Sequence, residues 1–146
     1  MGFRIRKEPV KNKSIPTLPV QNESISPILN LFPEYSALFV KTQKNLMAGN
    51  GSLPINQRHY IAMMASTAYN CETLANRERN SFLANGGDLT WLHNPHNVPN
   101  RIQKLKKVNT ILAETPWLLK PEQIKDLTNG KGSWTVSEIV HALGNN

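Results

Sequence analysis

The chain has 146 residues, of which 39% are hydrophobic and 7% aromatic, and its formal net charge is +7. This length is enough for one domain with a buried core. No stretch reaches the roughly 20 apolar residues that a membrane-spanning helix needs, and the basic start lacks the apolar run of a secretory signal. We expect no membrane contact and a location in the cytoplasm, and also in the nucleus.

The number of cysteines and the distribution of charge exclude several kinds of site. A single cysteine, Cys71, excludes an intramolecular disulfide framework and a zinc site built from several cysteines. In a reducing compartment Cys71 is expected to be a free thiol. The positive charges gather in residues 1–13 and 101–107, without the interleaved aromatic side chains of a nucleic-acid surface. We interpret them as a tail and a solvated helix face, and expect no nucleic-acid partner.

The chain begins with a segment of low periodicity. Residues 1–25 are rich in Lys, Arg, Pro, Ser and Asn, which predicts a disordered basic lead-in. Residues 26–146 form the single expected domain. Its first helix starts near Pro33, and Gly49 and Gly51 end it. Five side chains of this helix fall on one stripe at helical spacing: Tyr35, Leu38, Phe39, Thr42 and Leu46.

The longest predicted helix runs without interruption over residues 56–84. Two glycines, Gly86 and Gly87, end it, because glycine takes a left-handed conformation after a helix at no steric cost. The spacing predicts a continuous inward stripe of eight residues: Ile61, Met64, Ala65, Ala68, Cys71, Ala75, Glu78 and Phe82.

Shorter elements follow. Asp88 is predicted to cap a short turn, and a third long helix starts near Pro99 and ends at Pro116. The solvent side of that helix is expected to carry Arg101, Lys104 and Lys107.

The last part of the chain predicts two further helices. One runs from Pro121 to about Asn129, and the other starts at the capping box formed by Thr135 and Glu138. No alternating strand pattern occurs, so the predicted fold class is all-α. Three tryptophans are expected to pin short segments onto the bundle: Trp91, Trp117 and Trp134.

Several motifs recur in the order and spacing of one protein family. The central one is SLPINQRHYIAMMASTAYNCETLANRERNSFLANGGDLTWL, residues 52–92, with Cys71 at its middle. Similar pieces precede it in FPEY (32–35) and follow it in PWL (116–118) and around Trp134. Over roughly residues 28–143 the chain resembles the amino-terminal half of a sestrin.

The resemblance implies an AhpD-like helical bundle, one half of the two-domain sestrin architecture. In sestrins this half is credited with hydroperoxide reduction. The carboxy-terminal half carries leucine sensing and contacts with the GATOR machinery, through which sestrins restrain target-of-rapamycin (TOR) signalling. Nothing in the chain matches that second half, so GATOR contacts and leucine binding are implied for the family and not for this half alone.

The resemblance also implies a site at Cys71. The family places a tyrosine two residues after this cysteine and a histidine seven residues after it; here those positions hold Thr73 and Glu78. Thr73 offers a shorter and less acidic hydroxyl than a phenol. An ionised Glu78 on the face of Cys71 would disfavour the thiolate by like-charge repulsion. A buried thiol without catalysis is therefore the favoured interpretation.

An active site remains an alternative. A protonated Glu78 could donate a proton, and His59 lies twelve residues before Cys71, where AhpD proteins place a relay glutamate. Arg77 or Arg79 could stabilise a thiolate. No cofactor is expected, and no metal site, because His93 and His96 flank Pro95 and lack further ligands.

Three hypotheses about function follow. The chain is a regulatory domain of the sestrin type without efficient peroxidase activity, an atypical hydroperoxide reductase with Cys71 as nucleophile, or a truncated piece whose function depends on a missing carboxy-terminal half.

Overall fold

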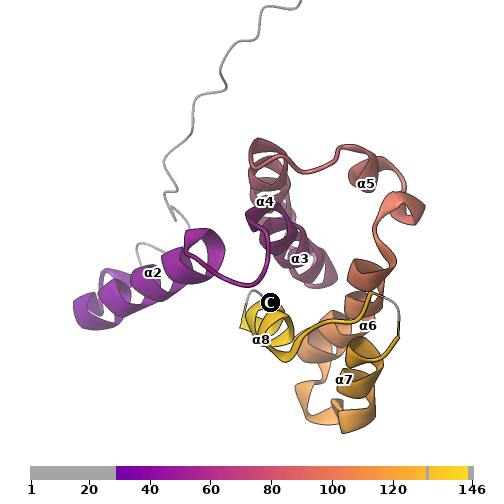
Figure 1. The fold of residues 1–146 in the computed structure, drawn as a ribbon. Helices are drawn as coiled ribbons and strands as arrows, with labels where there is room; N and C mark the ends of the chain where they lie inside the picture. Colours follow the sequence, from indigo (N-terminus) through magenta and orange to yellow (C-terminus); the bar gives the residue numbers. More distant parts are fainter. Residues whose placement is uncertain (1–28, 131, 145–146) are drawn as a thin grey trace, which may run out of the picture.

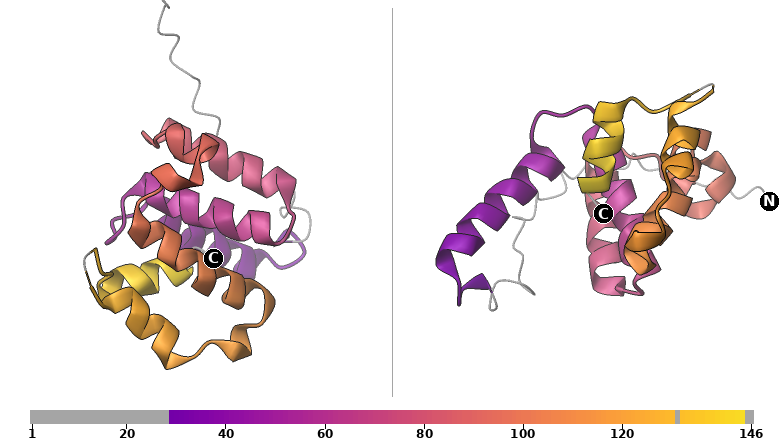
Figure 2. Two further views of the ribbon diagram at one scale, coloured as in Figure 1. Left: turned by 90° about the vertical axis from the view of Figure 1, so that its right-hand side faces the viewer. Right: turned by 90° about the horizontal axis from the view of Figure 1, so that it is seen from below.

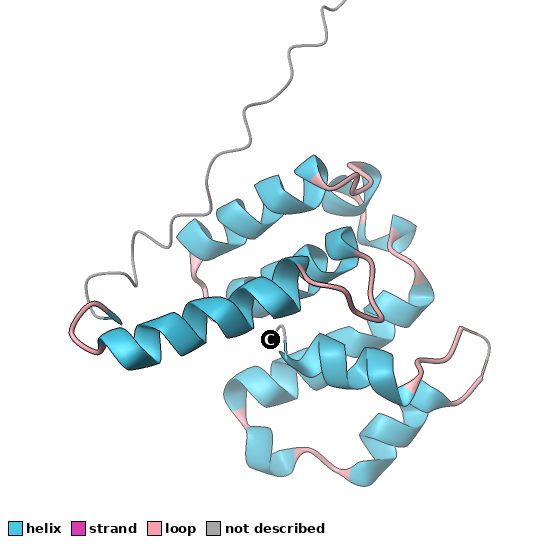
Figure 3. Cartoon of the chain, turned by 60° about the vertical axis from the view of Figure 1, so that its left-hand side comes forward, coloured by secondary structure: helices cyan, strands magenta, loops and turns pink. Residues whose placement is uncertain are grey.

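The computed structural model describes residues 29–130 and 132–144, so the lead-in predicted for residues 1–25 lies outside the described residues. Within those ranges every regular element is a helix (Figure 3), which confirms the all-α fold. None of the described helices is long and apolar enough to cross a bilayer. The elements are α2 (Pro33–Ala48), α3 (Ile55–Ala68), α4 (Glu72–Ala84), α5 (Thr90–His93), η1 (Pro95–Asn97), α6 (Asn100–Glu114), η2 (Pro116–Leu118), α7 (Pro121–Thr128) and α8 (Val136–Gly144).

The core forms where α3 packs between α4 and α6 (Figures 1 and 2). At one end, the rings of Tyr60, Phe82 and Trp91 lie 5.3 to 5.6 Å apart, centre to centre. Edge and tilted ring contacts of this kind stabilise a core beyond the area that they bury. The apolar side chains that are at most 4% exposed come from five helices and two loops: Leu53, Ile61, Phe82, Ile102, Leu105, Val108, Leu127, Trp134, Ile139 and Ala142.

The prediction of one helix over residues 56–84 is wrong. The chain leaves α3 at Tyr69, turns at Asn70 and starts α4 at Glu72. Asn70 has a φ of 54°, a left-handed conformation that asparagine adopts more readily than most residues. The backbone N–H of Cys71 donates to the carbonyl of Ser66 at 2.9 Å, which closes the turn. The two halves of the predicted helix therefore fold back on each other as a hairpin.

The hairpin changes the position of Cys71. It precedes the first residue of α4 and is exposed, so the prediction that it lies on a packed inward stripe is wrong. The rest of that stripe divides between two helices. Ile61 and Ala65 of α3 and Glu78 and Phe82 of α4 are buried, because each half keeps its own inward face.

Helix α2 forms as predicted but stands apart from the bundle, which it meets at its carboxy-terminal end (Figures 1 and 2). Arg58 of α3 holds this end. Its guanidinium donates to the carbonyls of Leu46 at 3.1 Å, Gly49 at 2.7 Å and Leu53 at 2.8 Å, and His141 of α8 also contacts the Leu46 carbonyl, at 2.9 Å. Burial lowers the pKa of Arg58, but the carbonyl oxygens at the negative end of α2 compensate its charge.

The start of α8 carries the predicted capping box. The Thr135 backbone N–H donates to Glu138 Oε2 at 2.9 Å, and the Glu138 N–H donates to Thr135 Oγ1 at 3.2 Å. Arg101, predicted to be solvated, instead contacts Glu138 Oε1 at 2.6 Å and lies 4.3 Å from the centre of the Trp134 ring. Helical spacing could not show this, because α8 comes from a distant part of the chain.

The tryptophans divide. Trp134 is buried and donates from its ring nitrogen to the Arg101 carbonyl at 2.9 Å, and Trp91 packs against the core, so both pin segments as predicted. Trp117 is 77% exposed, which contradicts the prediction for that residue.

Candidate functional site

The four residues singled out in the sequence lie on the α3–α4 hairpin. Cys71 is the residue before α4, Thr73 lies in its first turn and Glu78 near its middle, while His59 is in the second turn of α3. Cys71 and Thr73 are exposed, and Glu78 is buried. The two helices are antiparallel, so the start of α3 lies beside the later turns of α4. This arrangement brings together His59 and Glu78, and not His59 and Cys71.

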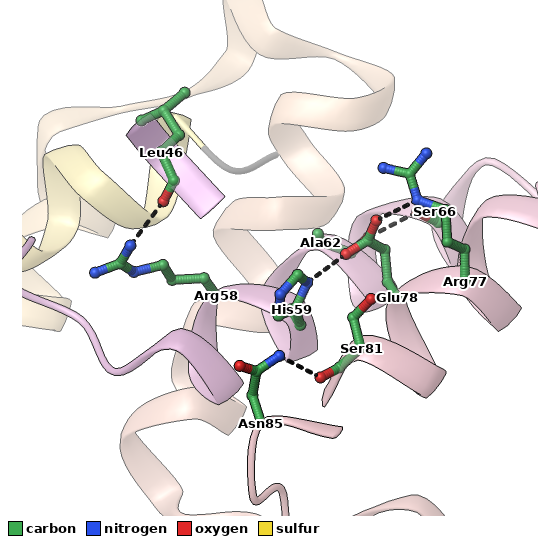
Figure 4. Close-up of polar contacts among 9 residues, drawn as sticks. All are labelled: Leu46, Arg58, His59, Ala62, Ser66, Arg77, Glu78, Ser81 and Asn85. Atoms are coloured by element: carbon green, nitrogen blue, oxygen red, sulfur yellow. Dashed lines mark hydrogen bonds and ion pairs between the residues drawn. The ribbon is translucent and has the colours of Figure 1, made fainter. Parts of the chain in front are cut away.

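His59 and Glu78 form a close polar pair. His59 Nδ1 lies 2.7 Å from Glu78 Oε2, and the two side chains are 14% and 4% exposed (Figure 4). Because a carboxylate only accepts hydrogen bonds, the Nδ1 of His59 donates to it. Arg77 Nε lies 3.3 Å from the other carboxylate oxygen, Oε1. Both oxygens of Glu78 are thus engaged, as a buried carboxylate requires.

The thiol of Cys71 is separate from this pair. Cys71 and Glu78 are seven residues apart, which at a rise of about 1.5 Å per residue is about 10 Å along the helix axis. The Glu78 carboxylate has a hydrogen bond with His59 and an ion pair with Arg77. Within the part of the chain that the structure describes, no such contact joins either member of the pair to the cysteine.

A groove of about 480 Å³ lies between α3 and α6. Met63 and Met64 line it from α3, and Lys106, Glu114 and the buried Asn109 line it from α6. No candidate catalytic residue lines this groove. It therefore does not bring a ligand to the thiol.

The histidines considered for a metal site lie in separate elements, His93 at the end of α5 and His96 in η1. Among the described residues, no group of three or more His, Cys, Asp or Glu side chains lies close enough to hold a metal ion. The chemistry open to this region is therefore that of the exposed thiol and of the buried His59–Glu78 pair.

Sequence reasoning missed Arg58. It is 2% exposed and joins α2 to the bundle. A signal was present, because Arg58 precedes Ile61 by three residues and Ala65 by seven, a spacing that puts all three on one helix face. A charged residue on an apolar face indicates a specific set of acceptors nearby.

Comparison with known proteins shows which family the chain belongs to. A sequence model of one family, described as PA26 p53-induced protein (sestrin), matches residues 9–144. Sestrin-1 of Macaca fascicularis is 38% identical over 122 residues, which cover 83% of this chain and 25% of the relative. The Sestrin homolog of Drosophila melanogaster is 36% identical over 121 residues, 83% of this chain and 24% of that protein.

A more distant relative extends the range of organisms. The Sestrin homolog of Dictyostelium discoideum is 34% identical over 116 residues, or 80% of this chain and 19% of its own length. The chain thus spans about a quarter or less of the length of these curated relatives. The family match extends on both sides of Cys71 and covers all of the described residues, and the chain belongs to the sestrin family.

Proposed function

We propose that this chain is a sestrin-like stress-response regulator that works through binding and not through efficient hydroperoxide reduction. The role proposed for it is negative regulation of TOR signalling and redox homeostasis, in the cytoplasm and also in the nucleus. The observation that carries the proposal is the separation of the exposed Cys71 from the buried His59–Glu78 pair.

Hydroperoxide reduction makes specific demands. A thiolate attacks the outer oxygen of R–O–OH, the O–O bond breaks, and the leaving alkoxide takes a proton to become an alcohol. The cysteine becomes a sulfenic acid, which an external dithiol reduces to the thiol, with release of water and a disulfide. Efficient turnover thus needs a proton donor within hydrogen-bond reach of the leaving oxygen.

The candidate helper residues around Cys71 do not provide a good proton donor of this kind. Thr73 is the nearest of the candidate helpers in sequence, and its hydroxyl is a poor acid. Glu78 engages both carboxylate oxygens with His59 and Arg77, and lies about two helical turns from the thiol. These features support weak or absent peroxidase activity.

The first prediction tests this proposal. Purified protein, supplied with cumene hydroperoxide and a dithiol, is expected to turn over no faster than its Cys71→Ser variant, measured as loss of hydroperoxide. The double variant Thr73→Tyr with Glu78→His introduces the tyrosine and the histidine that the family resemblance implies, and its loss of hydroperoxide is compared with that of the unmodified chain. Leu74→Tyr, which adds a phenol at the next position of α4, is the matched control. Rapid turnover by the unmodified chain that Cys71→Ser abolishes would overturn the proposal.

One observation favours an active, atypical reductase as the second candidate. Cys71 is exposed, so a hydroperoxide can reach the sulfur without any movement of the fold. This candidate requires that mild peroxide converts Cys71 to a sulfenic acid, which dimedone traps and mass spectrometry locates. A thiol that stays reduced under these conditions excludes it.

The third candidate follows from length. Since the chain spans about a quarter of its relatives, GATOR contacts and amino-acid sensing are proposed for a longer protein that contains this segment. Co-precipitation from cells of tagged GATOR components with this chain, compared with a full-length sestrin, tests the point. Equal recovery of GATOR components with this chain and with the full-length sestrin would place the partner surface in this segment.

A further inference from the structure

Three asparagines in the chain are followed directly by glycine, and the structure holds the three pairs in different ways. The pairs are Asn50–Gly51, Asn85–Gly86 and Asn129–Gly130. Such a pair can react with itself, because the backbone nitrogen of the glycine can attack the side-chain amide carbon of the asparagine. Glycine permits this approach, since it has no side chain to hinder the attack and its backbone rotates with little restriction. The conformation and the hydrogen bonds of each pair therefore decide which one reacts.

The pair Asn85–Gly86, at the end of α4, is held on both sides. The side-chain amide of Asn85 donates from Nδ2 to the Ser81 carbonyl at 2.8 Å. The backbone N–H of Gly86 donates to the Leu83 carbonyl at 3.1 Å. Asn85 also has a ψ of 25°, so its backbone continues in a nearly helical conformation. Attack requires both hydrogen bonds to open and the peptide to rotate, so the fold protects this pair.

The pair Asn50–Gly51 follows α2 and is restrained by packing. A side chain added to Gly51 would overlap the ring of His141 and lie close to the guanidinium of Arg58. These two side chains contact the carboxy-terminal end of α2. Rotation of the peptide that joins Asn50 to Gly51 would push the Gly51 backbone into them or away from them, so this pair is also hindered.

The pair Asn129–Gly130 has neither restraint. It lies in the loop from α7 to α8 (Figure 1), and both of its residues are exposed. Asn129 is extended, with a ψ of 144°. A Cβ added to Gly130 would meet no atom within 4 Å beyond the chain neighbours of this glycine. Within residues 29–130 and 132–144, no group accepts a hydrogen bond from the Gly130 N–H or contacts the Asn129 side-chain amide.

We propose that Asn129 is a site of spontaneous deamidation, at which the chain acquires a negative charge as it ages. The Gly130 nitrogen loses its proton and forms a bond to Cγ of Asn129. The bond from Cγ to Nδ2 breaks, and the side-chain nitrogen takes protons and leaves as ammonia. Water then adds to one of the two carbonyl carbons of the resulting five-membered ring and opens it to aspartate or isoaspartate. One water is consumed and one ammonia is released, with no oxidation or reduction.

The loop can accept this change without loss of the core. Leu127 and Trp134, on its two sides, are each 2% exposed, and the Trp134 backbone N–H donates to the Leu127 carbonyl at 2.8 Å. The new carboxylate appears directly after α7, where the negative end of the helix dipole disfavours it. Deamidation should therefore weaken the last turn of α7 and leave the contacts of Leu127 and Trp134 in place.

The test follows deamidation of the folded 146-residue chain in mildly alkaline buffer, which favours loss of the backbone proton. Trypsin places the three pairs in separate peptides, residues 45–58, 80–101 and 126–131. Mass spectrometry detects the replacement of an NH group by oxygen and locates it by fragmentation. Asn129 should convert at least about tenfold faster than Asn85, because the two hydrogen bonds at Asn85 must open first. Asn50 should also convert more slowly than Asn129.

Two controls separate the effect of the fold from that of the sequence. In guanidinium chloride the chain is unfolded, so the three asparagines should convert at similar rates. Labelling by an isoaspartyl methyltransferase after incubation of the folded chain should largely disappear in Asn129→Gln, because glutamine would have to close a larger ring. Asn85→Gln, the matched variant, should leave the labelling unchanged. Conversion of Asn50 or Asn85 as fast as Asn129 in the folded chain overturns the proposal. So does a preference for Asn129 that persists in guanidinium chloride, or labelling that Asn129→Gln leaves intact.

Discussion

Glu78 shows how a single charged side chain can be kept inside this small bundle. It is 3% exposed, and its carboxylate is held by His59 at 2.7 Å and Arg77 at 3.3 Å. Removing a carboxylate from water costs several kcal/mol unless hydrogen bonds replace the lost hydration. The two partners supply that replacement, one from each helix of the hairpin.

We therefore expect Glu78→Ala to lower the free energy of unfolding by about 1–3 kcal/mol, because it leaves His59 Nδ1 without its acceptor. Glu78→Gln should cost less, since an amide oxygen still accepts from His59. Urea unfolding measures both. Glu72→Ala, which removes an exposed carboxylate from the same helix, should cost less than about 1 kcal/mol. An equal loss for Glu72→Ala and Glu78→Ala would contradict this account.

The sequence predicted part of this arrangement. Helical spacing from Phe82, four residues further along α4, correctly placed Glu78 on an inward face. It could not identify His59 as the partner, because that contact depends on how α3 and α4 lie against each other. Their alignment is set by the turn at residues 69–71, which has no glycine or proline to mark it.

At the scale of elements, this turn decides the architecture of the hairpin. Asn70 is the non-glycine residue with positive φ among the described residues. Its side chain is exposed, so its backbone conformation, and not its packing, explains its role. An asparagine inside an otherwise helical run was the available signal for the break.

Asn70→Val should therefore destabilise the protein by about 1–2 kcal/mol, because a β-branched residue fits the left-handed conformation poorly. Asn70→Gly should be nearly neutral, because glycine adopts positive φ freely. Thermal and urea unfolding give the comparison. Asn76→Val, at an exposed position inside α4, serves as control and should change stability by only a few tenths of a kcal/mol. If Asn76→Val lowers the free energy of unfolding as much as Asn70→Val does, the left-handed turn does not explain the loss of stability.

Other elements were readable from local sequence. Pro33, Pro121 and the Thr135–Glu138 capping box each mark a helix start that the structure contains within a residue or two. These signals work because a helix end satisfies its free N–H groups with residues close by in sequence. The exposed position of Trp117 and the buried position of Arg58 depend on distant segments, which local signals do not report.

At the scale of the whole molecule, the contact between α6 and α8 joins the last helix to the bundle. Glu138 takes part both in the cap of α8 and in an ion pair with Arg101. Partial burial favours its neutral form, but the hydrogen bonds from Thr135 and Arg101 outweigh this effect and hold the pKa of Glu138 below its ordinary value of 4.5. Folding thus favours the ionised form.

This shift predicts an acid-sensitive contribution to stability. It is fully present above the unfolded pKa and is lost as the pH falls through the lower, folded pKa. Glu138→Gln should therefore be less stable than the unmodified chain near neutral pH, and the difference in stability should shrink in acid. Urea unfolding midpoints of both proteins, measured from neutral pH down into acid, give this difference. Glu114→Gln, at an exposed position of α6, is the control. A difference for Glu138→Gln that stays constant with pH would show that the charge is not responsible.

The whole arrangement also shows the limit of sequence analysis for this chain. The all-α class and the family follow from patterns along the chain, and both are confirmed. The AhpD-like character of the bundle and the roles of Cys71, Thr73, Glu78 and His59 in any reaction stay predictions, because reactivity depends on which groups meet in space and on the substrate.

The hydrogen bonds from Arg58 at the end of α2 have a consequence for the order in which the helices fold during translation. Its three acceptors lie no more than 12 residues before it, whereas the contact from His141 to the same helix end spans 95 residues. Closing a short loop costs little chain entropy, and the amino-terminal part of a nascent chain leaves the ribosome first. The orientation of α2 relative to α3 can thus form before α6, α7 and α8 are synthesised. The contact from His141 to the Leu46 carbonyl is then made to a helix that is already oriented.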